Sequence, residues 1–290
     1  MKKIAFLGCE NSHANAFLKL IREEKKYSDL EVIGVYSEDL EAAQKLSDEF
    51  GVPVMENYDS LCGQLDGVII TARHGANHYK YAKPYIADKI PMFVDKPITI
   101  DEDEAIKFMQ ELKANGIPVC GGSVCVFYDG VINMKKLVKE TPEEEVLGGV
   151  LRAPVDLENP YGDFFFYSQH LVSMMTEIFG YYPQSVFAKK NNRCVDILVN
   201  YGDFNVTLNY GIKNYNYFVG VSTKDGFTIE KTAHALDSFD HEFVEFANLL
   251  KGEEQPRSYN DFIAPVFVLN AIFRSMTSGK EEKVNRAPEI

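Results

Sequence analysis

The sequence lacks the features of several large classes of protein. It holds no run of about eighteen apolar residues, so no membrane-spanning helix and no membrane partner are expected. Its five cysteines are odd in number and scattered, without a C-x-x-C pair, which favours reduced thiols in the cytoplasm over a disulfide framework. Basic residues form no stripe, and a net charge of -13 repels a phosphate backbone, so nucleic acid is not expected as a partner.

Two catalytic signatures are also missing. Neither a G-x-S-x-G nucleophile elbow nor a P-loop lysine is present, which disfavours the corresponding hydrolases and nucleotide triphosphatases. What is present is an ordinary globular composition, with 46% hydrophobic and 25% charged residues over 290 positions. A chain of this length exceeds the usual size of one hydrophobic core, so two domains are expected.

The first part of the chain alternates short apolar strands with amphipathic helices. The pattern predicts strands over 3–8, 31–37, 52–55, 66–72, 91–97 and 117–122. It predicts helices over 14–26, 39–51, 76–88 and 101–115. Strands that are apolar on both faces and separated by helices indicate a parallel sheet covered on both sides. We therefore expect an α/β Rossmann domain, which binds a dinucleotide, over residues 1–122.

Residues 123–290 follow a different pattern. Alternating segments rich in Tyr, Phe and Val between 184 and 232 predict an antiparallel meander, and helices are expected over 129–140, 168–179, 238–251 and 260–278. This indicates an α+β domain with an open, mainly antiparallel sheet covered by helices on one face. Aromatic residues are expected on the other face, where they predict a homodimer or higher homo-oligomer: Tyr201, Phe204, Tyr210, Tyr215, Tyr217 and Phe218.

The loop after the first strand is the first place to look for a ligand, because ligands of parallel sheets lie beyond the carboxyl ends of the strands. Only Gly8 remains of a G-x-G-x-x-G fingerprint, and Glu10 and His13 occupy the other two glycine positions. Asn11 or Ser12 can cap the following helix. Capping alone and capping combined with contact to a phosphate both remain open.

The ends of the second and third strands offer further cofactor contacts. At the second, Ser37 is followed by Glu38, one position later than the carboxylate that usually takes the ribose hydroxyls. Its charge repels a ribose phosphate, which favours NAD slightly over NADP. The third strand ends in Thr71, Ala72 and Arg73. His74 and His78 have a spacing found in metal sites, but they lie in a strand-to-helix loop and no metal is expected.

Asp95, Lys96 and Pro97 end the fourth strand and precede Asp101, a good helix cap. With Thr71, His78 and the segment LDSFDHEFVEFANLLKGEEQP, this triplet resembles the Gfo/Idh/MocA family, named for glucose-fructose oxidoreductase and inositol dehydrogenase, over nearly the whole chain. The resemblance implies that Lys96 reaches both the nicotinamide and the substrate hydroxyl. The resemblance also implies that Asp95 and His78 lie beside the cofactor, together with the cofactor-binding residues proposed at the ends of the first three strands. The competing interpretation is a surface lysine paired with Asp95.

The second family signature, D-x-G-x-H, corresponds to residues 166–170. His170 is retained as the candidate general acid or base, whereas Phe166 and Ser168 replace the aspartate and the glycine. A histidine that titrates near neutrality can carry the hydroxyl proton while Lys96 stabilises the alkoxide. The alternative is a structural helix histidine behind an aromatic wall. The N-x-R-F stretch of the family is also changed, over 123–129, so anionic substrates lose an obvious arginine partner.

These residues predict an NAD(P)-dependent oxidoreductase that acts on a small molecule, either a sugar, a polyol or a related hydroxy or carbonyl compound. The alternative is a relative that has lost hydride transfer and serves as a ligand-binding or regulatory protein, because several family positions are replaced. A hydrolase or lyase that uses the dinucleotide transiently is a third hypothesis. The oxidoreductase hypothesis requires that Lys96 and His170 face one shared crevice.

Overall fold

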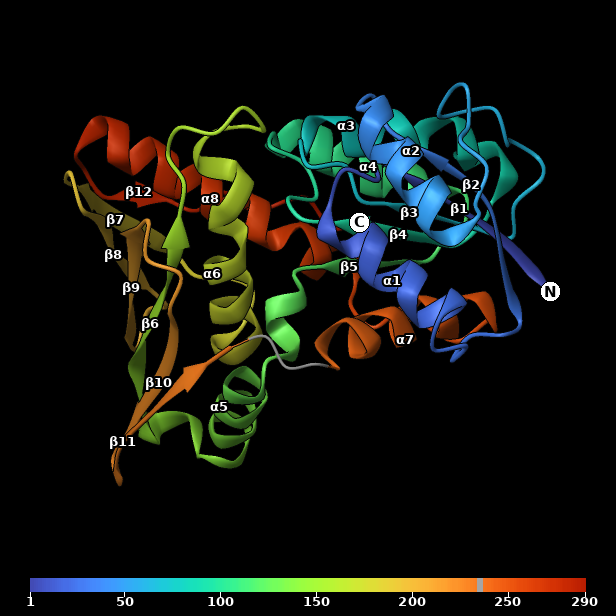
Figure 1. The fold of residues 1–290 in the computed structure, drawn as a ribbon. Coiled ribbons are helices and arrows are strands. Elements are labelled where there is room, and N and C mark those ends of the chain that lie inside the picture. Colours follow the sequence, from blue (N-terminus) through green and yellow to red (C-terminus); the bar gives the residue numbers. More distant parts are fainter. Residues whose placement is uncertain (234–236) are drawn as a thin grey trace.

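Two sheets lie side by side in the computed structural model, which describes residues 1–233 and 237–290 (Figure 1). The first sheet has five parallel strands in the order β2-β1-β3-β4-β5. Its elements are β1 (Lys2–Leu7), α1 (Ser12–Arg22), β2 (Leu30–Tyr36), α2 (Leu40–Phe50), β3 (Gly67–Ile70), α3 (Ala76–Ala82), β4 (Met92–Asp95), α4 (Glu102–Ala114) and β5 (Val119–Gly122). The predicted Rossmann architecture is confirmed.

Local chemistry explains where these helices begin and end. The side chains of Asn11, Asp39 and Asp101 each accept a hydrogen bond from a backbone N–H in the first turn of α1, α2 and α4. Gly51 ends α2 in the left-handed conformation, with φ of 66°. The strand expected over 52–55 is wrong, because only Val54 bridges to β2, and the preceding Pro53 has no N–H for a ladder.

The second sheet has seven strands in the order β11-β10-β6-β9-β8-β7-β12. They are β6 (Val146–Val155), β7 (Ser185–Lys190), β8 (Cys194–Asn200), β9 (Asn205–Ile212), β10 (Tyr217–Thr223), β11 (Gly226–Thr232) and β12 (Glu282–Lys283). The simple meander is wrong, because β6 lies between β9 and β10 and runs parallel to β9. Two glycines at 148 and 149 interrupt the alternation that would have predicted β6. Mainly antiparallel pairing is confirmed.

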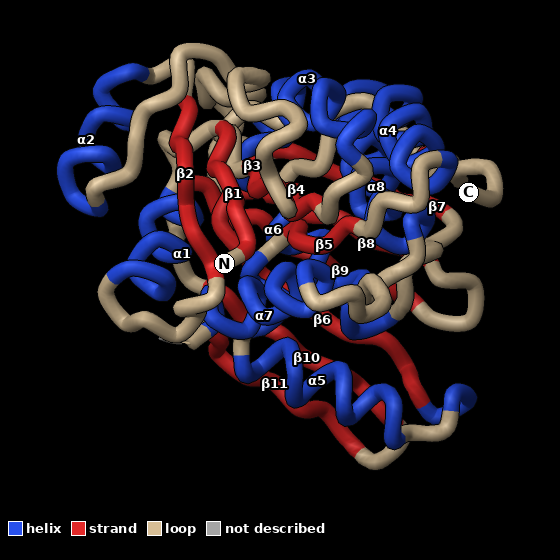
Figure 2. Tube along the Cα trace, turned by 90° about the vertical axis from the view of Figure 1, so that its right-hand side faces the viewer, coloured by secondary structure: helices blue, strands red, loops and turns tan. Residues whose placement is uncertain are grey.

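Helices pack against the two sheets in a way that the sequence pattern predicts only in part. α5 (Asp129–Glu140) runs beside β10 and β11 (Figure 2), and α6 (Phe164–Phe179) covers the centre of the second sheet. α8 (Tyr259–Ser278) packs on α4, α6 and β7. α7 (Ser238–Leu250) was expected on the second sheet, but its Phe243 and Phe246 complete a core with Phe17 and Phe93 of the first.

The open face of the second sheet differs from the predicted aromatic surface. Tyr210 is fully buried and its hydroxyl donates to the carbonyl of Ser168, while Tyr201 and Phe204 lie against Phe179 of α6. These three residues therefore face α6 rather than the open side of the sheet. Tyr217 reaches the cavity described below, Phe218 lies opposite Arg152 in the ladder, and Tyr215 is 69% exposed in a loop. Large exposed apolar residues stand elsewhere on the sheet: Phe187, Leu198, Phe227 and Ile229.

No helix in the described residues is long and apolar enough to cross a membrane.

Candidate active site

A cavity of about 240 Å³ opens at the carboxyl ends of β1, β3 and β4, where the first sheet meets α6. Lys96 and His170 both line it, although they lie far apart in the chain. The crevice that the oxidoreductase hypothesis requires is therefore present. The other lining residues are Asn11, Ser12, His13, Arg73, Val124, Tyr128, Phe166, Tyr167, Tyr217 and Phe239.

Lys96 is a cavity residue rather than a surface residue. It is only 5% exposed, and its ammonium nitrogen lies 4.9 Å from the ring centre of Phe166 and 5.8 Å from that of Tyr167. Its backbone N–H donates to Asp95 Oδ1 at 2.7 Å, but its side chain makes no ion pair with any described residue. The interpretation as a surface lysine paired with Asp95 is therefore wrong.

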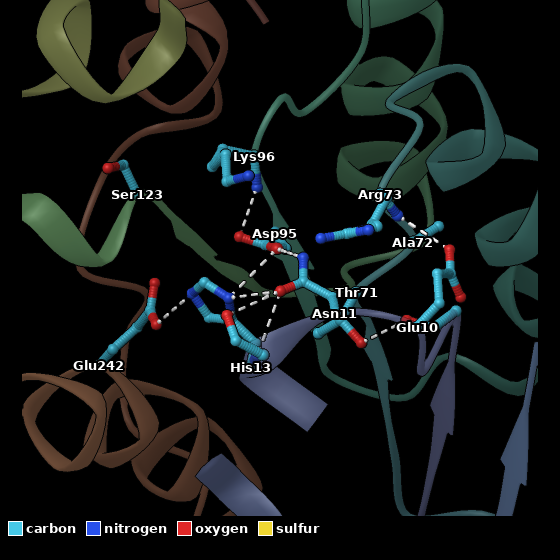
Figure 3. A network of polar contacts seen from close by, with 12 residues as sticks. Glu10, Asn11, His13, Thr71, Ala72, Arg73, Asp95, Lys96, Ser123 and Glu242 are labelled. Atoms are coloured by element: carbon cyan, nitrogen blue, oxygen red, sulfur yellow. Dashed lines mark hydrogen bonds and ion pairs between the residues drawn. The ribbon is translucent and has the colours of Figure 1, made fainter. Parts of the chain in front are cut away.

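Asp95 belongs instead to a buried polar network at the start of α1 (Figure 3). Its Oδ2 accepts a hydrogen bond of 2.6 Å from Asn11 Nδ2 and lies 3.4 Å from Nδ1 of His13. On the other side of the imidazole, Nε2 of His13 lies 3.2 Å from Oε2 of Glu242 on α7. Both Asp95 and Glu242 are fully buried. The network therefore connects the loop after β1 to the fourth strand and to α7.

Burial and charge set the protonation of this network. Burial lowers the pKa of His13, but the carboxylates of Asp95 and Glu242 outweigh it, and the net shift is upward. Burial raises the pKa of Glu242 to about 7, despite the opposing effect of His13. The folded chain thus holds protons here that the unfolded chain releases near neutral pH.

This network predicts that stability falls as pH rises. Both pKa values are higher in the folded chain than their ordinary values of 6.5 and 4.5, so their stabilisation is complete below the ordinary values. This stabilisation, on the order of 1 kcal/mol or more, is lost as pH rises through the pKa values that the two groups have in the folded chain. Between pH 5 and pH 8, this contribution should lower the melting temperature of the parent by several degrees relative to Glu242→Gln, at roughly 2–4 °C per kcal/mol. His78 and His170, whose pKa values are lowered, shift the stability of both proteins in the opposite direction.

Glu242→Gln should flatten this dependence, because it removes one titrating group and the charge that raises the pKa of His13. Thermal melts of both proteins across the pH range measure it. Glu253→Gln, at an exposed carboxylate just beyond α7, is the matched control and should melt like the parent. Parallel curves for the parent and Glu242→Gln would show that Glu242 does not titrate in this range.

The imidazole of His170 contacts η2, a short 3-10 helix (Val124–Phe127), and the residue that caps it. Its Nδ1 lies 2.7 Å from Ser123 Oγ and 3.3 Å from Cys125 Sγ. Burial, with the positive charges of Lys96 and His13, holds its pKa well below 6.5. The expectation that it titrates near neutrality is therefore wrong. At neutral pH His170 is an uncharged imidazole, which is able to accept a proton.

The side chain of Glu10 lies between the ends of three strands at the predicted cofactor site. Its Oε2 accepts a 2.6 Å hydrogen bond from Ser37 Oγ at the end of β2, and its Oε1 accepts one of 3.0 Å from the backbone N–H of Arg73. The carboxylate thus connects the ends of β1, β2 and β3. Glu38 points outward and pairs with Lys80 at 2.9 Å, and this partner lowers the pKa of Glu38.

The remaining predicted cofactor residues shape the loop from within. Gly8 adopts φ of +82°, and a Cβ there would lie 2.3 Å from the backbone of Ala72, so only glycine fits. Thr71 Oγ1 donates to the carbonyl of Gly8, and His78 Nε2 bonds the carbonyl of Ala72. Thr71, Ala72 and His78 are fully buried, so they hold the loop in position. Ser12, in contrast, lines the cavity itself.

The two histidines considered as metal ligands have other partners. Nδ1 of His74 accepts a hydrogen bond from the backbone N–H of Ala76, and burial lowers the pKa of His78. Within the described residues, no three His, Cys, Asp or Glu side chains are grouped so that they could hold a metal ion.

Sequence reasoning missed two important features of this site. Arg73 enters the cavity with its side chain, and Glu242 is the buried partner of His13. The second had a signal, because Glu242 falls on the same helix face as Phe239 and Phe246, an apolar face where a carboxylate needs a partner. No pattern in the sequence indicates the direction of the Arg73 side chain.

Comparisons with known proteins agree with this architecture. Residues 2–122 match the family model GFO_IDH_MocA, described as an oxidoreductase family with an NAD-binding Rossmann fold. Among solved structures, myo-inositol dehydrogenase from Lactobacillus casei in complex with NAD(H) and myo-inositol is similar, with a TM-score of 0.85 and 14% identity over 100% of this chain and 98% of that one. Myo-inositol dehydrogenase from Corynebacterium glutamicum is similar with a TM-score of 0.82 and 15% identity over 99% and 100%.

No curated protein matches the chain by sequence. Identities this low establish a shared fold, and the family model establishes the relationship of the first domain. Residues 2–122 therefore match the Gfo/Idh/MocA oxidoreductase family with its NAD-binding Rossmann fold, and the whole chain shares the fold of the two inositol dehydrogenases.

Proposed function

We propose that the protein is an NAD(P)-dependent oxidoreductase that acts on a sugar, a polyol or a related hydroxy or carbonyl compound. The observation that carries this proposal is the shared cavity of Lys96 and His170 at the end of β4. The match of residues 2–122 to an NAD-binding oxidoreductase family supports it. The inositol named with the Lactobacillus casei structure is a substrate class to try first.

The residues around the cavity fit a nicotinamide dinucleotide. The tight turn at Gly8 brings the loop against Ala72, and the N-terminus of α1, where N–H groups attract phosphate, lies at the cavity wall. Ser37 Oγ and the N–H of Arg73 can serve ribose hydroxyls once the side chain of Glu10 turns away. When bound, the dinucleotide supplies hydride acceptance or donation.

The chain's own residues handle the proton. In the oxidation direction, the ammonium of Lys96 stabilises negative charge on the substrate oxygen, and the neutral imidazole of His170 accepts the hydroxyl proton. Because Nδ1 of His170 faces Ser123, we assign the transfer to Nε2. The aromatic side chains of Phe166 and Tyr167 exclude water from the ammonium. Reduction uses the same groups in reverse.

We propose a slight preference for NAD over NADP. Glu38 stands at the end of β2, where its charge opposes a ribose phosphate. Lys80, at 2.9 Å, neutralises part of that charge, so the preference is small.

Calorimetric titration with NAD and NADP, followed by a turnover assay with a panel of polyols and sugars, tests the function. Micromolar binding of one dinucleotide and reduction of that dinucleotide by a polyol are expected. Binding without turnover would favour the rival hypothesis of a ligand-binding or regulatory relative, which is supported by Phe166 in place of the family aspartate and by Glu10 in the cofactor loop.

We further propose that the protein is cytoplasmic and forms a homodimer or higher homo-oligomer through the open face of the second sheet. Its five cysteines are free, as in a reducing compartment. Phe187 and Leu198 face each other across β7 and β8 and are 42% and 46% exposed, and Ile229 on β11 is 54% exposed. An apolar surface of this kind usually has a partner.

Light scattering coupled to size-exclusion chromatography tests the assembly. The parent is expected to elute at a multiple of 32.8 kDa at micromolar concentration. Leu198→Lys combined with Ile229→Lys should give the monomer, because two charges on each subunit would be buried in the interface. Lys139→Leu, on exposed α5, serves as a control for surface change. A monomeric parent would contradict the proposal.

A further inference from the structure

The cavity carries positive charge without a matching carboxylate. Arg73 and Lys96 both line it, and neither side chain has an ion-pair partner among the residues 1–233 and 237–290. Two acids beside the loop after β1 already have partners. Asp95 is bound by Asn11 and lies beside His13, and Glu10 bonds the backbone N–H of Arg73 rather than its guanidinium. In a chain of net charge -13, two cations without an ion-pair partner at one cavity indicate an anionic ligand.

The guanidinium of Arg73 lies against two aromatic rings. Its central carbon lies 4.8 Å from the ring centre of Tyr161, which precedes α6, and 5.6 Å from that of Phe166, in the first turn of α6. Figure 3 shows this side chain pointing from the end of β3 toward Asn11 and Lys96. Stacking on rings occupies the faces of a guanidinium and leaves its N–H edge for a planar acid group.

The replacement at position 166 is consistent with this charge. A phenylalanine stands where the resemblance places an aspartate, and its ring supports both cations. An aspartate here would add a negative charge beside Lys96 and Arg73. With Phe166 at this position, the first turn of α6 places a ring and no carboxylate beside the two cations.

We propose that the substrate is a hydroxy acid of the sugar type, such as an aldonate or a uronate, whose carboxylate is bound by Arg73 while its reacting hydroxyl lies at Lys96. This rests on the proposed oxidoreductase function. The reaction balances as a two-electron oxidation: the hydride leaves the carbinol carbon for the dinucleotide, and the hydroxyl proton passes to His170 and then to water.

The test compares acids with their neutral counterparts. With NAD, we expect kcat/KM for gluconate or glucuronate to exceed that for glucose or myo-inositol by at least about tenfold, since bidentate contact with Arg is strong. Arg73→Gln should lower the preference for acids, measured as the ratio of kcat/KM for the acids to that for neutral polyols, by about 10- to 100-fold. Lys83→Gln is the matched control, because Lys83 is an exposed cation over Tyr79 outside the cavity.

Calorimetry with the acids alone, and with NAD alone, separates the failures. Equal use of neutral and acidic compounds by the parent would overturn the inference. So would an Arg73→Gln protein that binds NAD more weakly but keeps the preference for acids, because Arg73 would then serve a cofactor phosphate. A preference for glucose 6-phosphate over both acids would also overturn it. Binding of an acid that depends on Arg73, without any turnover, would support the inference and contradict the oxidoreductase function.

Discussion

Replacing Lys96 with methionine is expected to lower kcat by about 10²- to 10⁴-fold, the range found when a proton-transfer or oxyanion-stabilising group is removed. Methionine preserves most of the length of the side chain and its contact with Phe166, so the fold and the binding of the dinucleotide should change little. The ammonium charge that stabilises the substrate alkoxide is lost. Steady-state rates of dinucleotide reduction measure the effect.

Lys107→Met is the matched control. Lys107 is an exposed lysine on α4, and its ammonium lies over the ring of Tyr79 on α3. It should retain full activity. If Lys96→Met kept more than about a tenth of the parental kcat while binding the same dinucleotide, the ammonium would not be part of the chemistry. Turnover would then depend on other groups of the cavity.

The cavity itself could be anticipated because topology determines it. Lys96 ends a strand of a parallel sheet, and the carboxyl ends of such strands meet at one edge, where ligands bind. The position of His170 at this edge of the first sheet could be predicted only from the family resemblance, because no periodicity of the sequence indicates that α6 packs there. The shared lining of Lys96 and His170 shows that both inferences led to one place.

The features that could not be anticipated depend on side-chain direction and on long-range pairing. β6 pairs with β9 and β10, which are distant in the chain, and its glycines at 148 and 149 hide the alternation. α7 has an apolar face that contains Phe243 and Phe246, and this face could pack against either sheet. Gly67 on β3 lets α7 pack closely on the first sheet, because a Cβ at this position would lie 2.6 Å from Leu250 of α7.

The charge of the cavity shows the same limit. The absence of the family arginine over 123–129 argues against anionic substrates, whereas the folded chain supplies an arginine from another loop. Arg73 follows β3, and only the rings of Tyr161 and Phe166 across the crevice reveal where its side chain lies. Missing motif residues therefore say little about the charge of a site that is assembled from several loops.

Glu10→Gly is expected to tighten the binding of NAD by about tenfold, which corresponds to about 1.4 kcal/mol. The substitution restores the second glycine of the fingerprint, where backbone must approach the pyrophosphate. It also frees Ser37 Oγ and the N–H of Arg73, which the carboxylate now occupies. The two lost hydrogen bonds should lower the stability of the free protein by roughly 1 kcal/mol. Calorimetric titration and thermal melting measure these two effects.

Glu10→Gln distinguishes charge from occupancy. Its side-chain oxygen can keep one hydrogen bond, so it should give only part of the gain, whereas Glu49→Gln on the exposed face of α2 should give none. Weaker binding by Glu10→Gly would mean that the Glu10 carboxylate itself holds the ribose hydroxyls. If neither the parent nor Glu10→Gly binds a dinucleotide, the obstacle lies beyond this side chain, and the Rossmann domain has lost its cofactor while keeping its fold.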